Sequence, residues 1–388
     1  MKRLAAPLLC SSFFLLMACG SNNTNSKNPE QNTTAKTEQT SAAKQIYQVE
    51  TVAHFNEPWA ITSLPDHRLL VTERQGKLKL FNPQNKQMLD VQGVPAVNYG
   101  GQGGLGDVVL HPDFAKNHWI YLSYAAKGQG GSGAVISRAK LDLSNPNQPK
   151  LIEVKQIWQQ VPKVSGQGHY GHRMLFGADG KLWVSSGERQ KFDPAQDMQS
   201  NLGKVLRLNE DGSAAVGNPF YKQGGVTAEI WSLGHRNPLG MAFDSKGQLW
   251  VVEMGPKGGD ELNIITKGEN YGYPIVSNGD HYSGEPIPDH HTRPEFKALR
   301  LIGPVISPSS LIIYRGQQFP AWQNKALIGG LSSKAIVVVD LEHKPVKEIQ
   351  RLEMKQRIRG LHEAQDGSIW VIEDGPDARL LKLSNKPS

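Results

Sequence analysis

Cysteine is almost missing from this chain of 388 residues, which has only Cys10 and Cys19, both in the first twenty positions. The remainder can form no disulfide, and it has no thiol nucleophile and no cysteine-ligated metal. Charged residues make up only 20%, and long runs of Ala, Glu and Lys are absent, which argues against a helical bundle or coiled coil. The 43 basic and 36 acidic residues are interspersed, without the basic stripe expected of a nucleic-acid-binding protein.

The first residues have the pattern of an export signal. Lys2 and Arg3 precede an apolar stretch over residues 4–17, which is too short to span a bilayer comfortably. The stretch leads into Leu-Met-Ala-Cys19, which resembles the bacterial lipobox and implies cleavage before Cys19 and a lipid on it. Gly and Ser follow rather than Asp, so the resemblance implies an outer-membrane lipoprotein facing the periplasm. An ordinary signal peptide with an incidental cysteine is the alternative.

The segment after this signal differs in composition from the rest. It is rich in Asn, Thr, Ser, Lys and Gln and has no apolar periodicity, so it cannot bury enough surface to fold. We therefore expect three parts: a signal peptide over 1–18, a flexible polar tether over 19–45 and a folded domain over 46–388.

A strand–turn–strand pattern recurs through the folded part, which holds most of the 40 glycines and 24 prolines. Each copy has a short apolar strand, a Pro-Asp or Asp-Gly turn and a second apolar strand, as in a β-hairpin. Spacings of roughly 40–70 residues leave room for two more strands per copy. We predict an all-β, six-bladed β-propeller of four-stranded antiparallel blades, with a β-sandwich or two stacked β-domains as the alternative. The copies begin near Trp59, Leu105, Met174, Met241, Leu311 and Gly360.

Two loops between the expected strands carry polar residues that turns alone do not need. Gln102 lies in Tyr-Gly-Gly-Gln-Gly-Gly-Leu, where backbone can approach a ligand closely; a flexible turn is the alternative. His169 and His172 lie in Gly-His-Tyr-Gly-His-Arg. A zinc site would need further ligands in register. A general base fits better, because imidazole titrates near neutral pH, and a structural histidine remains the alternative.

Two further regions suggest anion and cation binding. Arg236 and Asn237, in Gly-His-Arg-Asn-Pro, can bind carboxylate or carbonyl groups through forked hydrogen bonds. The glycine-rich stretches 253–261 and 268–274 supply carbonyls and carboxylates, the oxygen ligands that calcium prefers; plain surface turns are the alternative.

The last polar region is Gln-Arg-Ile-Arg-Gly, which contains Arg357 and Arg359. Residues two apart on a strand point the same way, so these two guanidinium groups suggest a polyanionic ligand. An exposed, charged strand face is the alternative.

In this order, the motifs resemble those of the soluble sugar dehydrogenases that depend on pyrroloquinoline quinone (PQQ), especially the bacterial aldose sugar dehydrogenases. The matching stretches run from Glu57-Pro-Trp-Ala to Arg379-Leu-Leu. They include Gly-Gly-Gln-Gly-Gly-Leu-Gly-Asp-Val-Val-Leu-His-Pro-Asp-Phe, Gly-His-Arg-Asn-Pro, Gly-Pro-Lys-Gly-Gly-Asp-Glu and Arg-Ile-Arg. Members of this family are six-bladed propellers, in agreement with the number of repeats.

The resemblance implies oxidation of an aldose at its anomeric carbon to the lactone. His169 would take the proton of the anomeric hydroxyl, while hydride passes from that carbon to PQQ. The carbonyls of Gly255 and Pro256 would bind a calcium ion that polarises the cofactor, and the Glu261 carboxylate with the Tyr271 carbonyl would bind a second. The residues implied to hold PQQ are Gln102, Arg236, Asn237, Tyr282, Arg357 and Arg359.

The chain departs from the family pattern at three places. Gly168 stands where the glucose dehydrogenase branch has an acidic residue that supports the histidine. Met254 replaces the histidine of a common Glu-His-Gly-Pro stretch. Ser332 stands where relatives often have a cofactor-contacting lysine, and Lys334 follows two positions later.

The implied partners are an aldose, a quinone or other electron acceptor, and a membrane through the lipid on Cys19. We expect a monomer or weak dimer and no nucleic acid. A cofactor-free propeller that binds sugars or proteins is the main alternative. A calcium-dependent lactonase fits less well, because it would have no role for Arg357 and Arg359.

Overall fold

The computed structural model describes residues 47–297 and 305–386. The signal peptide expected over 1–18 and the tether expected over 19–45, with Cys19, lie outside the described residues and stay predictions. Within the described ranges, no helix is long and apolar enough to cross a membrane.

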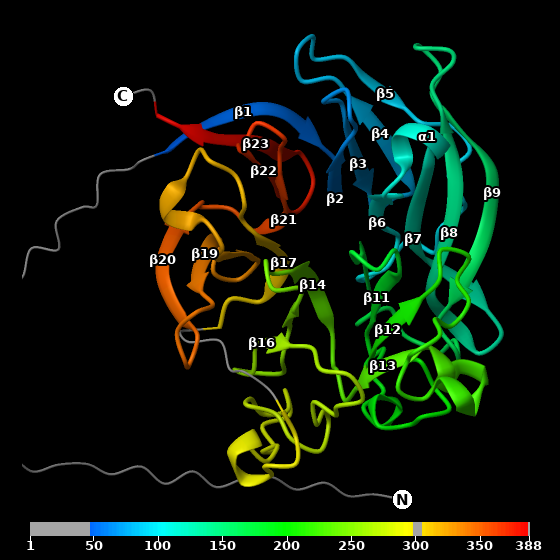
Figure 1. Cartoon of the computed structure of the whole chain (residues 1–388), viewed down its shortest axis with the longest axis vertical. Coiled ribbons are helices and arrows are strands. Elements are labelled where there is room, and N and C mark those ends of the chain that lie inside the picture. Colours follow the sequence, from blue (N-terminus) through cyan, green and yellow to red (C-terminus); the bar gives the residue numbers. More distant parts are fainter. Residues whose placement is uncertain (1–46, 298–304, 387–388) are drawn as a thin grey trace, which may run out of the picture. The chain divides into compact units, whose positions relative to one another are not determined.

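Six small antiparallel sheets form a ring, which confirms the six-bladed propeller (Figure 1). Blade 1 contains β2 (Pro58–Ser63), β3 (Leu69–Glu73), β4 (Lys77–Phe81) and β5 (Met88–Asp90), and blade 2 contains β6 (Leu105–Leu110), β7 (Trp119–Gly128), β8 (Gly131–Asp142) and β9 (Lys150–Gln159). Blade 3 contains β10 (Gly171–Phe176), β11 (Leu182–Ser186), β12 (Lys204–Leu208) and β13 (Ile230–Leu233), and blade 4 contains β14 (Pro238–Phe243), β15 (Leu249–Glu253) and β16 (Glu261–Ile264). Blade 5 contains β17 (Pro308–Ile313), β18 (Ala326–Gly330), β19 (Ala335–Asp340) and β20 (Lys347–Glu353), and blade 6 contains β21 (Ile358–Glu363), β22 (Ile369–Glu373), β23 (Ala378–Asn385) and β1 (Tyr47–Phe55).

Helices are few and short among the described residues. The one α-helix, α1, spans Phe114–Asn117. The 3-10 turns span Asp193–Ala195, Tyr221–Gln223, Gly225–Glu229, His290–Thr292 and Pro320–Trp322. Blade 4 has three strands in the described ranges instead of the expected four.

The hairpins that the sequence predicted are the first two strands of each blade, and their turns close in a repeated way. In blade 3 the Gly177 N–H donates to the Lys181 carbonyl, and in blade 4 the Asp244 N–H donates to the Gln248 carbonyl. The second strands are buried at every position in β3, β11, β15, β18 and β22. This burial explains their continuous apolar sequences.

A tryptophan at the start of the second strand lies opposite a cation of the third strand in three blades. Each pair is a direct cross-strand neighbour, with the ammonium or guanidinium 5.2–5.9 Å from the indole ring centre, a distance suited to cation–π attraction. The pairs are Trp119 with Lys140, Trp183 with Arg207 and Trp370 with Lys382.

The N-terminal strand closes the ring. β1 pairs antiparallel with β23 from Tyr47 opposite Asn385 to Phe55 opposite Ala378, with one bulge between Thr51 and Ala53. The outer strand of the last blade therefore comes from the beginning of the folded domain (Figure 1).

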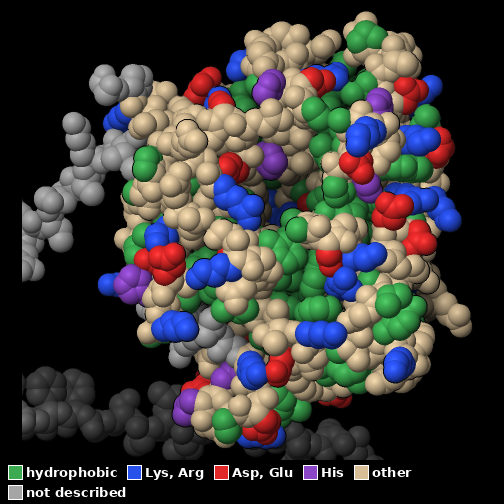
Figure 2. Space-filling view, viewed as in Figure 1, with side chains coloured by type: hydrophobic (Ala, Val, Ile, Leu, Met, Phe, Trp, Pro, Cys, Tyr) green, Lys and Arg blue, Asp and Glu red, His purple; other side chains and the backbone are tan. Residues whose placement is uncertain are grey.

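The inner strands of the blades face a central channel. Figure 2 shows a hollow in the middle of one face of the ring, bordered by hydrophobic side chains. A cavity of about 490 Å³ on this axis is lined by residues of β2, β6, β10, β17 and β21, including Ala60, Val108, Met174, Ser310 and Leu361.

Candidate functional site

A polar cavity of about 370 Å³ lies where the inner strands begin and the second strands end. Its walls therefore come from segments that are far apart in the sequence but adjacent at one face of the ring. Four of the sequence-predicted residues line it, namely Gln102, Asn237, Arg357 and Arg359. The other lining residues are Glu57, Trp59, Arg74, Gly101, Tyr170, Gly171, His172, Leu239, Met254, Ser307, Leu331, Asp374 and Gly375.

Arg357 and Arg359 point to the same side, but not through regular strand alternation, because Arg357 precedes β21 (Ile358–Glu363) and a bulge lies between Ile358 and Gly360. Both reach Asp374, which follows β22: Arg357 Nε donates at 2.7 Å, and Arg359 Nε and Nη2 donate at 2.9 and 2.8 Å. Burial would raise the pKa of Asp374, but the two guanidinium groups hold it below its ordinary value. One carboxylate against two guanidinium groups leaves a net positive charge and spare N–H donors beside the cavity.

Gln102 and Asn237 connect the cavity wall to the segment that carries His169. The Gln102 side-chain oxygen accepts the His169 backbone N–H at 2.8 Å. The Asn237 oxygen accepts the Gly171 N–H at 3.2 Å. Both amide oxygens are engaged with this loop, so their amide nitrogens are the groups available as donors.

His169 itself is buried, with 6% exposed, and lies beside the cavity rather than among its lining residues. Its Nδ1 is hydrogen-bonded to a carboxylate oxygen of Glu188, which follows β11. A carboxylate only accepts, so Nδ1 carries the hydrogen and Nε2 keeps the free lone pair. Burial lowers the pKa of His169, the Glu188 bond opposes this, and the pKa stays below its ordinary value. The imidazole is therefore neutral at neutral pH, as a base must be.

Sequence reasoning missed Glu188. It noted only that Gly168 stands where the glucose dehydrogenase branch has an acidic residue that supports the histidine. The structure supplies the carboxylate from the next loop, and a Cβ at Gly168 would come within 2.3 Å of the Gln190 side chain. Burial would raise the pKa of Glu188, but hydrogen bonds from His169 and from the backbone N–H groups of Phe192 and Lys191 keep it below its ordinary value. Its position two residues after the end of a buried strand was the available signal.

The loop after Glu188 is held in an unusual conformation. Phe192 has φ 63° and ψ −82°, a backbone conformation that a bulky residue rarely adopts. The second Glu188 oxygen accepts the Lys191 and Phe192 N–H groups at 2.5 and 2.8 Å. The Phe192 ring is 44% exposed and meets the His281 ring at 5.5 Å. One carboxylate thus orients both the histidine and an exposed aromatic ring.

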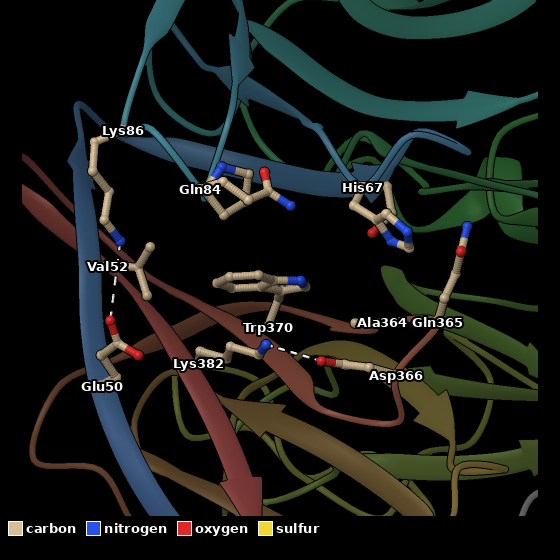
Figure 3. Close-up of a pocket in the computed structure, with 12 residues that line it drawn as sticks. Glu50, Val52, His67, Gln84, Lys86, Ala364, Gln365, Asp366, Trp370 and Lys382 are labelled. Atoms are coloured by element: carbon tan, nitrogen blue, oxygen red, sulfur yellow. Dashed lines mark hydrogen bonds and ion pairs between the residues drawn. The ribbon is translucent and has the colours of Figure 1, made fainter.

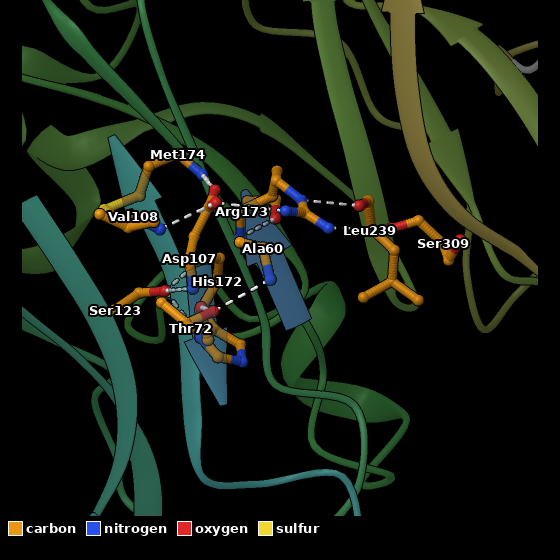
Figure 4. Close-up of polar contacts among 12 residues, drawn as sticks. Ala60, Thr72, Asp107, Val108, Ser123, His172, Arg173, Met174, Leu239 and Ser309 are labelled. Carbon is orange, nitrogen blue, oxygen red and sulfur yellow. Dashed lines mark hydrogen bonds and ion pairs between the residues drawn. The ribbon is translucent and has the colours of Figure 1, made fainter. Parts of the chain in front are cut away.

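His172 has a structural environment, in line with the alternative given above. Its Nδ1 bonds to the Ser123 hydroxyl at 2.9 Å (Figure 4), and its ring stacks on Trp59 with the ring centres 4.9 Å apart. Burial lowers the pKa of His172 to about 3. In the described part of the chain, no three His, Cys, Asp or Glu side chains are grouped so as to hold a metal ion.

Arg173 lies at the ring axis and joins four other blades (Figure 4). From β10 it forms an ion pair with Asp107 of β6 at 3.2 Å and donates to the Leu239 carbonyl of β14 and the Ser309 carbonyl of β17, both at 3.0 Å. Its guanidinium also lies 4.0 Å from the ring centre of Trp59 in β2. Trp59 lines the polar cavity and Arg173 lines the axial cavity. These two side chains therefore lie between the two cavities.

Arg236 lies next to the segment expected to bind calcium. Its Nη1 donates to the Met254 and Gly255 carbonyls at 2.7 and 2.8 Å. The Pro256 carbonyl accepts the Gly259 N–H at 3.1 Å. A Cβ at Gly255 would come within 1.8 Å of the Gly259 carbonyl oxygen, so only glycine allows this tight loop. The Gly255 and Pro256 carbonyls, expected to bind calcium, thus each accept one hydrogen bond within the protein.

The two residues expected at a second calcium site converge on His290. Its Nε2 contacts the Tyr271 carbonyl at 2.9 Å and its Nδ1 lies 3.9 Å from the Glu261 carboxylate. Burial and the nearby Glu253 raise the pKa of Glu261 well above its ordinary value. A buried carboxylate and a backbone carbonyl are oxygen donors of the kind that a hard cation prefers, and here the His290 ring lies against both.

The remaining predicted positions are placed less centrally. Tyr282 is 75% exposed and lies 5.8 Å from the Arg236 guanidinium, measured to its ring centre. Neither Ser332 nor Lys334 lines the cavity, although the preceding Leu331 does. Arg74, another lining residue that sequence reasoning missed, donates to the Gly101 and Gly103 carbonyls.

A third cavity, of about 340 Å³, lies between turns of blades 1 and 6 (Figure 3). Trp370 lies in its middle, with Lys382 paired to Asp366 at 2.9 Å on one side and Lys86 4.0 Å from Glu50 on the other. No sequence-predicted residue lines it.

Comparisons with known proteins show the family to which the chain belongs. The family model described as glucose/sorbosone dehydrogenase matches residues 55–382. The aldose sugar dehydrogenase YliI of Escherichia coli K12 is 39% identical over 345 residues, covering 85% of this chain and 90% of that protein. The crystal structure of the soluble aldose sugar dehydrogenase from Escherichia coli in the apo form has a TM-score of 0.79 at 37% identity, covering 88% of this chain and 100% of that one. The PQQ-bound aldose sugar dehydrogenase from Streptomyces coelicolor has a TM-score of 0.70 at 27% identity, covering 88% and 98%.

Proposed function

The chain belongs to the glucose/sorbosone dehydrogenase family, and on that premise we propose that it oxidises aldoses at the anomeric carbon to the lactone, with PQQ and calcium. The observation that carries the proposal is the His169–Glu188 pair beside a cavity walled by Arg357 and Arg359. A proton acceptor and an anion-binding wall at one cavity are what oxidation of a sugar hydroxyl by an anionic cofactor requires.

The donor set fits a cofactor that carries several carboxylates. Arg357 and Arg359 keep spare N–H donors after Asp374 is satisfied, and the Gln102 and Asn237 amide nitrogens face the same cavity wall. Arg236, which has a buried Nε without a hydrogen-bond partner, would add a further cation. When bound, PQQ would supply the two-electron acceptor for the hydride of the anomeric carbon.

His169 acts as the general base through Nε2. Because Glu188 fixes the hydrogen on Nδ1 and remains ionised, the imidazole can take a proton at Nε2 and the imidazolium is stabilised by the adjacent carboxylate. An alkoxide releases hydride more readily than an alcohol, so this proton transfer favours oxidation. Phe192, held by the same carboxylate, would limit how the sugar approaches.

The carbonyls of Gly255 and Pro256 would hold one calcium ion, and Glu261 with the Tyr271 carbonyl a second. Tyr282, near Arg236, would complete the cofactor pocket. We also propose that the protein is exported and anchored through a lipid on Cys19. A quinone or other periplasmic acceptor would reoxidise the reduced cofactor, and the protein would be a monomer or weak dimer.

Reconstitution tests the proposal. Purified protein is mixed with PQQ and Ca²⁺, and dye reduction is followed with glucose, other aldoses and disaccharides. We expect turnover with at least one aldose and an absorbance change from the bound cofactor; neither signal with any sugar would overturn the proposal. His169→Ala should abolish turnover and keep PQQ binding. His362→Gln is the matched control, because this half-buried histidine bonds to Ser63 and does not line the polar cavity.

A further inference from the structure

Lys204 is a buried cation that the proposed function does not use. It is the first residue of β12 and is 0% exposed. Its Nζ donates to the carbonyls of Pro194, Ala195 and Leu202 at 2.7, 3.1 and 2.7 Å, so each of its three N–H groups has an acceptor. Burial lowers the pKa of Lys204 to about 7, against the attraction of Asp197. Because an apolar side chain of similar length would avoid this cost, the ammonium needs a role other than filling the core.

Two of these carbonyls belong to the 3-10 turn Asp193–Ala195, which directly follows Phe192. The turn ends a loop that begins at Glu188, whose carboxylate accepts the Phe192 N–H at 2.8 Å. Gly203, next to Lys204 in the chain, packs on the turn so closely that a Cβ on it would come within 2.6 Å of the last Cα of the turn. Glu188 and Lys204 therefore hold the same loop at its two ends.

The same turn also lies against two other segments of the site. The Ala195 carbonyl accepts the N–H of Gly234, which begins the Gly-His-Arg-Asn motif, at 3.0 Å. The next residue, Gln196, exchanges hydrogen bonds with Asn270 at 3.1 and 2.6 Å and donates to the Tyr273 carbonyl at 2.7 Å. A displacement of the turn would therefore reach these segments as well as the loop before it.

We infer that Lys204 is a positioning residue for His169. Its ammonium fixes the Asp193–Ala195 turn, and through this turn it keeps the Glu188 carboxylate against the imidazole. The loop between them has positive φ at three positions, and backbone conformations of this kind persist only where surrounding contacts enforce them. The inference rests on the proposed function and adds to it a residue that does not line the polar cavity.

The test observes His169 in the cofactor-free protein. Nitrogen NMR of the imidazole shows which ring nitrogen carries the hydrogen, and a pH titration gives the pKa of His169. Lys204→Met removes the ammonium and keeps a side chain of similar length. Lys325→Met is the matched control, because this half-buried lysine pairs with Asp340 of blade 5 at 2.9 Å. If Lys204→Met does not fold, Lys204→Gln serves in its place.

We expect Lys204→Met to lower the pKa of His169 and to shift the imidazole hydrogen from Nδ1 towards Nε2. The reason is that Glu188, whose hydrogen bond and charge raise this pKa, is no longer held in place. Loss of a positive charge alone would raise the pKa of His169, so the sign separates displacement of the loop from a long-range charge effect. Arg236 and Arg189, the other charged groups that act on the imidazole, are unchanged in all variants.

Turnover of the protein loaded with PQQ and Ca²⁺ gives a second readout. We expect Lys204→Met to lower kcat by about 10²-fold, the cost of a misplacement of about 1 Å in an active site. Added to Glu188→Gln, it should cause little further loss, because both substitutions act through one contact. Fully additive losses would contradict the inference.

The NMR result decides the inference without any turnover. An unchanged pKa and an unchanged tautomer of His169 in Lys204→Met overturn it, and so does an equal change in Lys325→Met. A parent protein that oxidises no aldose would overturn the proposed function instead.

Discussion

Replacing Glu188 by glutamine tests the arrangement at His169 most directly, because the amide cannot satisfy all three of its neighbours. In the protein, the two carboxylate oxygens accept one hydrogen bond from His169 Nδ1 and two from the Lys191 and Phe192 N–H groups. An amide has one oxygen and one NH₂ group. If the oxygen serves the two backbone groups, the NH₂ faces Nδ1, which must then accept.

This arrangement keeps every hydrogen bond but moves the imidazole hydrogen from Nδ1 to Nε2. A neutral imidazole with its hydrogen on Nε2 cannot take a proton from a sugar at that atom. We therefore expect kcat to fall by about 10²–10⁴-fold, the contribution of a general base, while PQQ affinity stays unchanged because Glu188 does not line the cavity. The remaining activity should persist to lower pH than in the wild type, since the ionised Glu188 carboxylate that had raised the pKa of His169 is gone.

Steady-state dye reduction over a pH series, with PQQ titrated separately, measures both quantities. The matched control is Glu229→Gln, which changes a half-buried carboxylate next to β13 of the same blade that accepts from Trp158 and Asn201 at 2.9 and 3.1 Å. A Glu188→Gln protein with wild-type kcat would refute the reasoning. So would a double variant with His169→Ala that is much slower than His169→Ala alone, because residues that act as a unit are not additive.

Three further outcomes are expected. Arg357→Ala should raise the dissociation constant of PQQ by at least tenfold in a fluorescence titration, because a charge-assisted hydrogen bond is lost; an unchanged constant would remove Arg357 from the site. Arg173→Met should lower the free energy of unfolding in urea by about 3–5 kcal/mol, the cost of leaving the buried Asp107 unpaired; a loss below about 1 kcal/mol would contradict its role at the axis. His172→Gln should flatten the pH dependence of stability. The pKa of His172 is about 3 in the folded protein and 6.5 in the unfolded chain, so between these values the unfolded chain binds more protons. The stability of the wild type therefore falls by about 1.4 kcal/mol per pH unit as the pH drops from 6.5 towards 3. Equal slopes of urea-derived stability between pH 4 and 6 would show that His172 is not the cause.

The propeller and part of its site were predictable because they depend on local patterns. Each hairpin carries its own apolar strands and turn residues, so six copies could be counted without any long-range contact. Arg357 and Arg359 stood out by their two-residue spacing, but strand periodicity does not place them, because Arg357 precedes β21 and a bulge lies between Ile358 and Gly360. Gln102 was noticed because it lies in a glycine-rich loop, and Asn237 because it follows an arginine in a motif suited to binding carboxylates. Both line the cavity.

The contacts that decide the chemistry were not predictable in this way. Glu188 contacts His169 from a loop after β11 that has positive φ values at Arg189, Gln190 and Phe192, a conformation that is uncommon for residues other than glycine. Asp374 follows a different strand from the arginines that it pairs with. The position of Arg236 on the Gly255 carbonyl depends on side-chain packing between two loops, which a linear sequence does not express.

Ring closure by β1 also determines the order in which the fold can be completed. β1 is the first strand to be synthesised, but its partner β23 is the last, so the nine-residue strand has no native neighbour until the chain is finished. A free strand edge invites pairing with other chains, and β1 presents exposed polar side chains at Gln48, Glu50 and His54 that discourage it. The final contact joins the two ends of the folded domain, which makes the ring slow to close, and the free edge of β1 is protected only once it has closed.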